Sequence, residues 1–293
     1  MADGDLLEGF RCMETGRFAQ PQIWGNLPLQ TKQPIWDGKT SLNGKTIIIY
    51  LEAGIGDQVL FIRFLKPLKK RYPHVKMVVA CRKEVYPIFK SLSVIDQWTD
   101  PSQLVPHDYW FPSMRLPLAL ELTYAQLDGS PYLLRPRTIS PLQPRSFKIG
   151  LRWWSHPAVF ERIFPPCRML DLIRQFPQAR FYSFQRDAGE EFTPPHLSRA
   201  NMTSWQSTMD WLNQMDLVIS SCTSVAHVAA AMGIPTWVIV PKLCWYPWGF
   251  EGDKTPWYHS VRIFRQKRYW YWQETFAEVA RCLNSILVAE KKS

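Results

Sequence analysis

The sequence predicts an α/β protein built from two Rossmann-like, doubly wound domains. At 293 residues the chain exceeds the usual size of one hydrophobic core. Apolar, β-branched runs alternate with helical stretches along most of the chain, which is typical of a parallel sheet covered by helices. A segment with three prolines, 135–146, separates the two halves. We therefore expect domains at 1–140 and 141–293 that face a central cleft, with the last helix packing back on the first domain.

The first domain begins with a helical pattern over 3–18. The continuous apolar run 46–51 is typical of a buried parallel strand. A helical stretch follows, and Pro67 must kink or restart it because the proline ring removes a backbone donor. The remaining elements expected here are strands at 76–81 and 109–112 and a short helix at 84–92.

The second domain repeats the alternation of strands and helices. A helix over 224–232 is expected to end at Gly233 and Pro235. A capping-box pattern at 207–210 predicts the start of a helix that runs to Met215. The other elements expected are strands at 148–152, 180–185, 217–220 and 236–240 and a helix at 169–176.

The composition is that of an ordinary globular protein with more basic than acidic residues. Six cysteines are scattered without a CxxC pair, so we expect reduced thiols. The net charge of +10 favours an anionic partner, although such a charge also serves solubility alone. The short basic cluster 69–71 is either a contact for an anionic partner or a set of cations that stabilises the C-terminal end of a helix. The 14 tryptophans indicate a stacking surface or interface as well as a core.

Targeting and membrane signals are not recognised in the sequence. The first residues lack the basic start and apolar run of a secretory signal. The longest apolar stretch, 225–240, is interrupted by His227, Gly233 and Pro235, so we expect no transmembrane segment. These features predict a cytoplasmic protein.

The loop Gly54-Ile-Gly56-Asp57 is the first candidate site. Ligands of open parallel sheets bind beyond the carboxyl ends of the strands, and this loop follows a strand and opens a helix. Glycines there let the backbone approach a ligand, and Asp57 is favoured by the helix dipole. The alternative is that Asp57 only caps the helix. The third glycine of the dinucleotide fingerprint is missing.

The second candidate site lies at 220–227, where a strand end rich in hydroxyl residues becomes a helix. Free N–H groups and the positive helix end suit a diphosphate, and Thr223 and Ser224 add hydroxyl donors. Ordinary N-capping explains the same residues. His227 stands one turn into the helix, either as a ligand contact or as a core histidine.

The third candidate site follows the strand at 148–152. Arg152 or Arg162 has the forked guanidinium that neutralises a leaving diphosphate, unless it serves in a surface ion pair. The only Asp-x-Asp pattern, at 3–5, is best explained by chance, so no metal site and no cofactor are expected. Departure of a diphosphate then relies on the helix end and arginine.

Taken in order, several stretches resemble the heptosyltransferase-type glycosyltransferases of family 9, especially the bacterial branch associated with tetratricopeptide repeats. The resemblance covers roughly residues 34–285, and the order and spacing of the motifs make it fairly specific. The matching stretches are 34–38, 42–46, 52–57, 149–153, 181–185, 215–219, 223–227, 231–235 with Trp237, 255–258 and 262–266.

The resemblance implies a GT-B fold and a metal-independent transfer of sugar, with inversion, from a nucleotide-diphosphate donor held mainly by the second domain. In the family the Asp of the Gly-x-Gly-Asp loop is the general base, which puts Asp57 in that role. The donor-binding positions expected here are Gly54, Gly56, Arg152, Arg162, Gln185, Thr223, Ser224 and His227. The acceptor is expected to be anionic or a saccharide, such as a lipopolysaccharide core, or a protein.

The chain departs from the family pattern at two places. Cys222 stands where relatives usually have Asp, and Trp154-Ser155-His156 replaces smaller residues in the first loop of the second domain. These changes favour a first alternative, a nucleotide-sugar-binding protein that has lost catalysis. The positive charge leaves a second alternative, a glycosyltransferase that acts on modified DNA.

Overall fold

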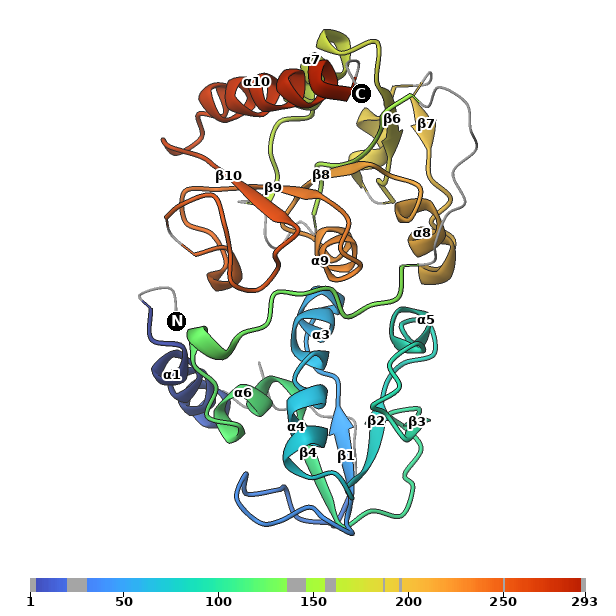
Figure 1. Cartoon of the computed structure of the whole chain (residues 1–293), viewed down its shortest axis with the longest axis vertical. Helices are drawn as coiled ribbons and strands as arrows, with labels where there is room; N and C mark the ends of the chain where they lie inside the picture. The colour runs from blue at the N-terminus through green and yellow to red at the C-terminus, as the bar shows by residue number, and fades with distance from the viewer. Residues whose placement is uncertain are drawn as a thin grey trace. The chain divides into compact units, whose positions relative to one another are not determined.

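The computed structural model describes residues 4–19, 31–135, 146–155, 162–186, 188–194, 197–249 and 251–290. The chain divides into two compact units, Met1–Asp128 and Gly129–Ser293, and each contains its own parallel sheet (Figure 1). Most of the proline-rich segment expected as a linker lies outside the described residues, as do His156 and the Asp3 of the Asp-x-Asp pattern.

Unit 1 contains a four-stranded sheet in the order β3-β2-β1-β4. Every neighbouring pair is parallel, as the apolar strand at 46–51 predicts. The strands are β1 (Thr46–Tyr50), β2 (Lys76–Ala80), β3 (Gln97–Thr99) and β4 (Tyr109–Pro112). The inner position of β1 explains its sequence, because Ile47, Ile48 and Ile49 are all fully buried.

Within the described residues, the α-helices of unit 1 are α1 (Leu6–Ala19), α3 (Ile55–Ile62), α4 (Leu65–Arg71), α5 (Tyr86–Phe89) and α6 (Leu116–Ala119). Pro67 falls in the first turn of α4, where backbone N–H groups lack intrahelical partners, so the helix restarts as expected. The helix expected at 84–92 is wrong in length, since α5 forms only one turn.

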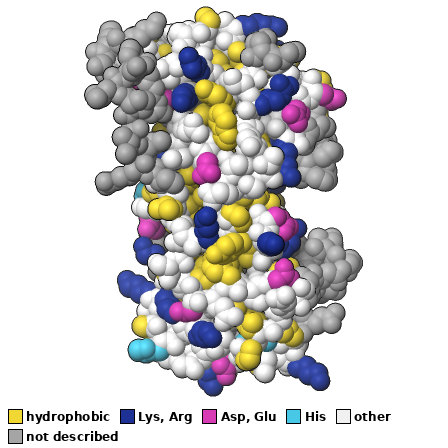
Figure 2. Space-filling model, turned by 90° about the vertical axis from the view of Figure 1, so that its right-hand side faces the viewer, with side chains coloured by type: hydrophobic (Ala, Val, Ile, Leu, Met, Phe, Trp, Pro, Cys, Tyr) yellow, Lys and Arg dark blue, Asp and Glu magenta, His cyan; other side chains and the backbone are white. Residues whose placement is uncertain are grey.

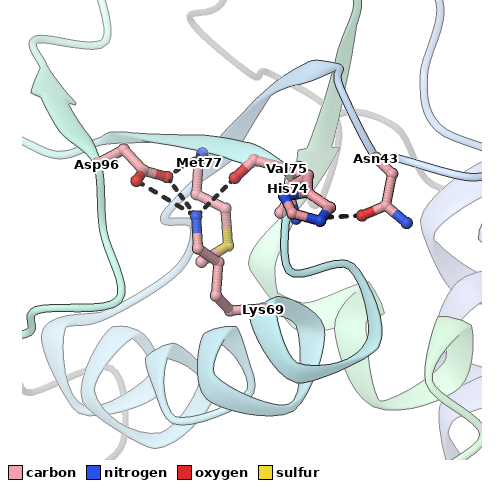
Figure 3. A network of polar contacts seen from close by, with 6 residues as sticks. All are labelled: Asn43, Lys69, His74, Val75, Met77 and Asp96. Carbon is pink, nitrogen blue, oxygen red and sulfur yellow. Dashed lines mark hydrogen bonds and ion pairs between the residues drawn. The ribbon is translucent and has the colours of Figure 1, made fainter.

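Lys69 of the basic cluster at 69–71 belongs to an internal network in unit 1 (Figure 3). Its Nζ donates to the Val75 carbonyl at 2.6 Å and to Asp96 Oδ2 at 2.9 Å, and Asp96 also accepts from the Met77 N–H at 2.7 Å. Burial alone would raise the pKa of Asp96, but the Met77 N–H and the Lys69 ammonium together hold it below its usual value. Lys69 therefore ties α4 to β2.

Unit 2 contains a six-stranded parallel sheet in the order β10-β9-β8-β5-β6-β7. The strands are β5 (Lys148–Arg152), β6 (Arg180–Ser183), β7 (Ser198–Arg199), β8 (Leu217–Ser221), β9 (Thr236–Val240) and β10 (Val261–Arg265). The sequence did not predict β3, β7 or β10. The first two are very short, and β10 carries arginines because it lies at an edge of the sheet.

The main helices of unit 2 are α7 (Pro166–Gln175), α8 (Trp205–Leu212), α9 (Ser224–Ala231) and α10 (Gln273–Glu290). The expected start of α8 at Ser207 is wrong. Ser204 is the N-cap, and its side chain accepts from the N–H of Ser207, which is the third helical residue. The capping box is present, but it begins three residues earlier because Ser204 has the extended backbone that an N-cap needs.

Helix α10 packs beside α7 over the sheet of unit 2 (Figure 1). Its buried face joins the apolar core of that unit through Phe276, Val279, Leu283 and Leu287. None of the helices in the described part of the chain combines the length and apolar character needed to span a bilayer. Figure 2 shows Lys and Arg side chains spread over one face of the described surface, without gathering there in a single basic patch.

Candidate functional site

Each sheet has a point where the strand order reverses. In unit 2, β5 lies between β6 and β8, and in unit 1, β1 lies between β2 and β4. Ligands of open parallel sheets bind beyond the carboxyl ends of the strands at such points. In unit 2 this rule selects the residues that follow β5 and β8, and in unit 1 it selects the residues that follow β1.

The start of α9, directly after β8, lacks a side-chain cap. Thr223 is the N-cap in extended conformation, yet its side chain makes no capping hydrogen bond. Its Oγ1 lies instead 3.1 Å from Ser220 Oγ, and the fully buried Ser221 Oγ makes no hydrogen bond. Backbone N–H groups of a first helical turn have no intrahelical acceptor. Hydroxyl groups and a helix start without a side-chain cap therefore lie together, which is the chemistry of an anion site.

Gln185 connects the ends of β5 and β6. Its Oε1 accepts from the N–H groups of Trp153 at 2.9 Å and Trp154 at 3.3 Å. Arg152 makes a second connection, donating from Nη1 to the Phe184 carbonyl at 2.6 Å. Both side chains are buried. Gln185 and Arg152 therefore shape the end of the sheet beside the start of α9, and both carry structural bonds whatever ligand binds there.

Arg162 stands shortly before α7. Its guanidinium lies 5.5 Å from the centre of the Trp245 ring, within reach of a cation–π interaction. An arginine beside an aromatic face retains its N–H donors at the edge of the guanidinium plane. This arrangement is compatible with contact to a phosphate, and the surface ion pair stays an alternative.

His227 is a buried member of an aromatic cluster. It is only 5% exposed, and its Nδ1 lies 2.9 Å from the Tyr258 hydroxyl. The imidazole packs against the ring of Trp248, with ring centres 5.0 Å apart. Trp248 in turn donates from Nε1 to Cys222 Sγ at 3.0 Å. The geometry therefore matches the alternative of a core histidine, and it gives Cys222 a structural partner.

In unit 1, Asp57 caps its own helix. Gly54 is the N-cap of α3, and its N–H donates to Asp57 Oδ2 at 3.1 Å, which is one half of a capping box because glycine has no side chain to supply the other half. A Cβ atom at Gly54 would stand 3.2 Å from that oxygen, so glycine eases the approach. The preceding Ala53 has a φ of +60°, a strained value for a residue with a side chain. The structure thus shows a capping contact of Asp57, and its role as a general base stays a prediction.

The structure groups the expected residues by unit. Arg152, Gln185, Thr223 and Ser224 share the carboxyl edge of the sheet in unit 2, whereas Gly54, Gly56 and Asp57 belong to unit 1. Sequence reasoning missed Trp248 and Tyr258, because these residues lie far from their partners Cys222 and His227 along the chain. Within the described residues, no group of three or more His, Cys, Asp or Glu side chains is placed to hold a metal ion.

Comparison in sequence gives one curated relative. No family model matches the chain. It is similar to the Protein FlbA of Caulobacter vibrioides, with 27% identity over 97% of this chain. The alignment covers 53% of that protein, so the chain spans about half the length of the relative it matches.

Comparison in structure gives several glycosyltransferases. The chain is similar to a glycosyl transferase of family 9 from Veillonella parvula DSM 2008, with a TM-score of 0.61, 12% identity, and coverage of 85% of this chain and 91% of the other. It is also similar to the E. coli ADP-heptose lps heptosyltransferase II, with a TM-score of 0.57, 14% identity, and coverage of 84% and 99%. E. coli heptosyltransferase WaaC with ADP gives a TM-score of 0.55 at 11% identity, covering 82% and 97%.

These likenesses show the fold. The chain consists of two parallel-sheet α/β domains of the GT-B class, as the sequence predicts. The association with tetratricopeptide repeats stays a prediction.

Proposed function

We propose that this protein is a glycosyltransferase that binds a nucleotide-diphosphate sugar at the carboxyl edge of the sheet in unit 2. The observation that carries the proposal is the start of α9 at the reversal of strand order, where Thr223 provides no cap and Ser221 Oγ is buried without a hydrogen bond. A structural relative supports it, because E. coli heptosyltransferase WaaC has solved structures with ADP and with ADP-2-deoxy-2-fluoro heptose.

The donor diphosphate is held without a metal ion in this proposal. The first-turn N–H groups of α9 and the hydroxyls of Thr223 and Ser224 bind its oxygens. Arg162 or Arg152 neutralises the charge that develops as the diphosphate leaves. Gln185 contacts the nucleotide, and His227 supports the helix through Tyr258 and does not itself carry the reaction.

The sugar is transferred with inversion. The Asp57 carboxylate takes the proton of an acceptor hydroxyl, the hydroxyl oxygen attacks the anomeric carbon, and the bond from that carbon to the diphosphate breaks. The nucleoside diphosphate departs with the bonding electrons. Unit 1 carries the base and unit 2 carries the donor. The acceptor class in this proposal is a saccharide, a lipopolysaccharide core or a protein.

A second candidate is a nucleotide-sugar-binding protein without catalysis. It is favoured by two contacts: Asp57 is engaged as a helix cap, and Cys222, at the position where relatives usually have Asp, accepts from Trp248. Both candidates predict saturable binding of the donor. Only the enzyme releases nucleoside diphosphate when an acceptor is supplied, so product release separates them.

A cytoplasmic location belongs to the proposal. All six cysteines are free thiols in the structure, which suits a reducing compartment. Modified DNA as the acceptor stays a prediction. Duplex binding that weakens steeply with salt would support it, and its absence at low salt would eliminate it.

A thermal-shift panel tests the proposed function. Purified protein is heated with ADP-, UDP-, GDP-, dTDP- and CMP-linked sugars, and calorimetry follows any stabilising ligand. A donor present at 100 times its Kd is expected to add about 2.7 kcal/mol to the free energy of unfolding. Absence of stabilisation and of saturable binding across the whole panel would remove the proposal.

A further inference from the structure

We propose that unit 2 contains a separate binding groove for a neutral oligosaccharide, formed beyond the ends of β9 and β10. The groove has a volume of about 880 Å³ and borders a turn that displays aromatic side chains. None of the residues assigned above to the donor or to the reaction lines it. The inference therefore stands independently of the proposed glycosyltransferase activity.

The turn lies between β10 and α10 (Figure 1). Tyr271 N–H donates to the Arg268 carbonyl at 3.1 Å, and the two residues form an antiparallel bridge. The two residues at the tip are strongly exposed, Tyr269 at 54% and Trp270 at 67%. Together with Tyr271 at 38% they form a run of three consecutive exposed aromatic residues, and contiguous exposed apolar surface is typical of an interface or a ligand site.

The backbone of the turn is strained at its most exposed residue. Trp270 has a φ of +61°, a conformation that has an energetic cost for a residue with a side chain. A glycine would fit there without this cost. The buried Gln266 holds the strained conformation: with its amide oriented to accept, it receives hydrogen bonds from Trp270 N–H and Trp272 Nε1, both at 3.2 Å. Strain that is maintained to present an exposed tryptophan points to a binding role.

Cations fix the neighbouring tyrosine rings. Lys242 Nζ lies 5.2 Å from the centre of the Tyr269 ring, and the Arg268 guanidinium lies 4.2 Å from that of Tyr271. Such cation–π contacts are attractive and favour these positions of the rings. Lys242 also lines the groove, so the aromatic turn borders the groove at Lys242.

The charges that line the groove indicate the kind of ligand. The described lining residues include three cations and three anions: Lys242, Arg265 and Lys267, and Glu251, Asp253 and Glu278. A balanced lining gives no net attraction to a phosphate group or to an anionic membrane surface. It does supply both donors and acceptors, which sugar hydroxyls need, while aromatic faces pack against the apolar C–H faces of sugar rings. The volume lies in the range of small-molecule sites, about 300–1,000 Å³.

Calorimetry with four neutral hexasaccharides tests the groove: maltohexaose, cellohexaose, mannohexaose and chitohexaose. The wild-type protein is expected to bind at least one of them saturably. Trp270→Gly removes the ring and relieves the positive φ, so it should raise the melting temperature while lowering the affinity at least tenfold. Tyr86→Ala, which truncates a partly exposed aromatic residue of unit 1, should leave the affinity unchanged.

Three results would overturn the inference. These are the absence of binding to all four saccharides, equal affinities of the wild-type protein and Trp270→Gly, and binding to phosphatidylglycerol vesicles that Trp270→Gly abolishes. The last result would assign the turn to a membrane surface. Binding of nucleotide sugars is measured on the same samples, so failure of the saccharide groove is distinguishable from failure of the proposed donor site.

Discussion

Helices α3 and α9 both follow strands of a parallel sheet, but their first turns differ in chemistry. At the start of α3, the side chain of Asp57 accepts a hydrogen bond from the Gly54 N–H. The start of α9 has no side-chain cap at Thr223 and no acidic residue in its first turn. The carboxylate of Asp57 would repel an anion at the start of α3, whereas the dipole of α9 attracts one.

The difference between the first turns of α3 and α9 shows that a turn containing glycine does not by itself define a phosphate site. At α3 the Gly54 N–H is already engaged by the carboxylate, so this loop is better suited to move a proton than to hold a diphosphate. At α9 the first-turn N–H groups and the hydroxyls of Thr223 and Ser224 are donors of the kind that an anion needs. The two helix starts therefore divide the proposed reaction between base and donor.

The largest expected effect is on turnover. Asp57→Asn keeps an oxygen that accepts from Gly54 but removes the basic carboxylate. General base catalysis contributes 10²–10⁴-fold, so we expect turnover to fall about 10³-fold. Donor affinity should stay within a few-fold. Turnover is measured as the release of nucleoside diphosphate in the presence of an acceptor, and donor affinity is measured by calorimetry. Unchanged turnover would remove Asp57 from the mechanism.

The next effect concerns the N–H groups of α9. Ser224→Pro removes one first-turn donor, and the extended Thr223 before it, with ψ of 167°, is compatible with proline. We expect the affinity for a nucleoside diphosphate to fall about tenfold, or about 1.4 kcal/mol, without loss of thermal stability. Ser224→Ala is the matched control, since it removes the hydroxyl and keeps the N–H. Equal affinities of the two variants would show that this N–H does not contact the ligand.

Variants of Gln185 separate a structural role in unit 2 from a role in nucleotide binding. Gln185→Ala leaves the N–H groups of Trp153 and Trp154 without their acceptor, so the free energy of unfolding should fall by about 1–3 kcal/mol. Gln185→Glu keeps an acceptor but adds a negative charge near the proposed diphosphate. It should retain more stability than the alanine variant and yet lose about tenfold in nucleotide affinity. Chemical denaturation measures the free energy of unfolding, and calorimetry measures the nucleotide affinity. Equal stabilities of the alanine variant and the wild-type protein would contradict the role of Gln185 as the acceptor for Trp153 and Trp154.

The smallest expected effects are changes in the free energy of unfolding when residues at the helix starts are replaced. Asp57→Ala and Ser204→Ala each remove a capping contact and should cost about 1 kcal/mol of the free energy of unfolding. Thr223→Ala removes no capping bond and only a neutral contact with Ser220, so about half of that cost is expected. Urea unfolding at neutral pH measures all three variants. A larger loss for Thr223→Ala would show that its side chain does cap α9.

Local signals predicted much of the fold. The buried run in β1 and the restart of the helix at Pro67 depend on residues close in sequence. The start of α8 was placed three residues late, because several hydroxyl residues there could serve as the cap and only the backbone conformation of Ser204 decides. Strands β3 and β7 are too short to show a period of two.

The candidate site was less predictable than the fold. Asp57 and its cap are three residues apart, so the sequence offered both of its roles. His227 and Tyr258 are 31 residues apart, and Cys222 and Trp248 are 26 apart, so only the folded chain shows that these side chains are partners. The missing hydrogen bond of Ser221 Oγ is a property of tertiary packing and has no local signal.

The most direct test of the central claim is an amide-resonance titration of the labelled protein with ADP, UDP and GDP. A diphosphate held by the open start of α9 should saturate at least one titration and shift the amides of residues 224–226 most strongly. The amides of residues 54–57 should move little. No saturable shift with any of the three nucleotides, or shifts centred on residues 54–57, would contradict the assignment of the donor to the start of α9.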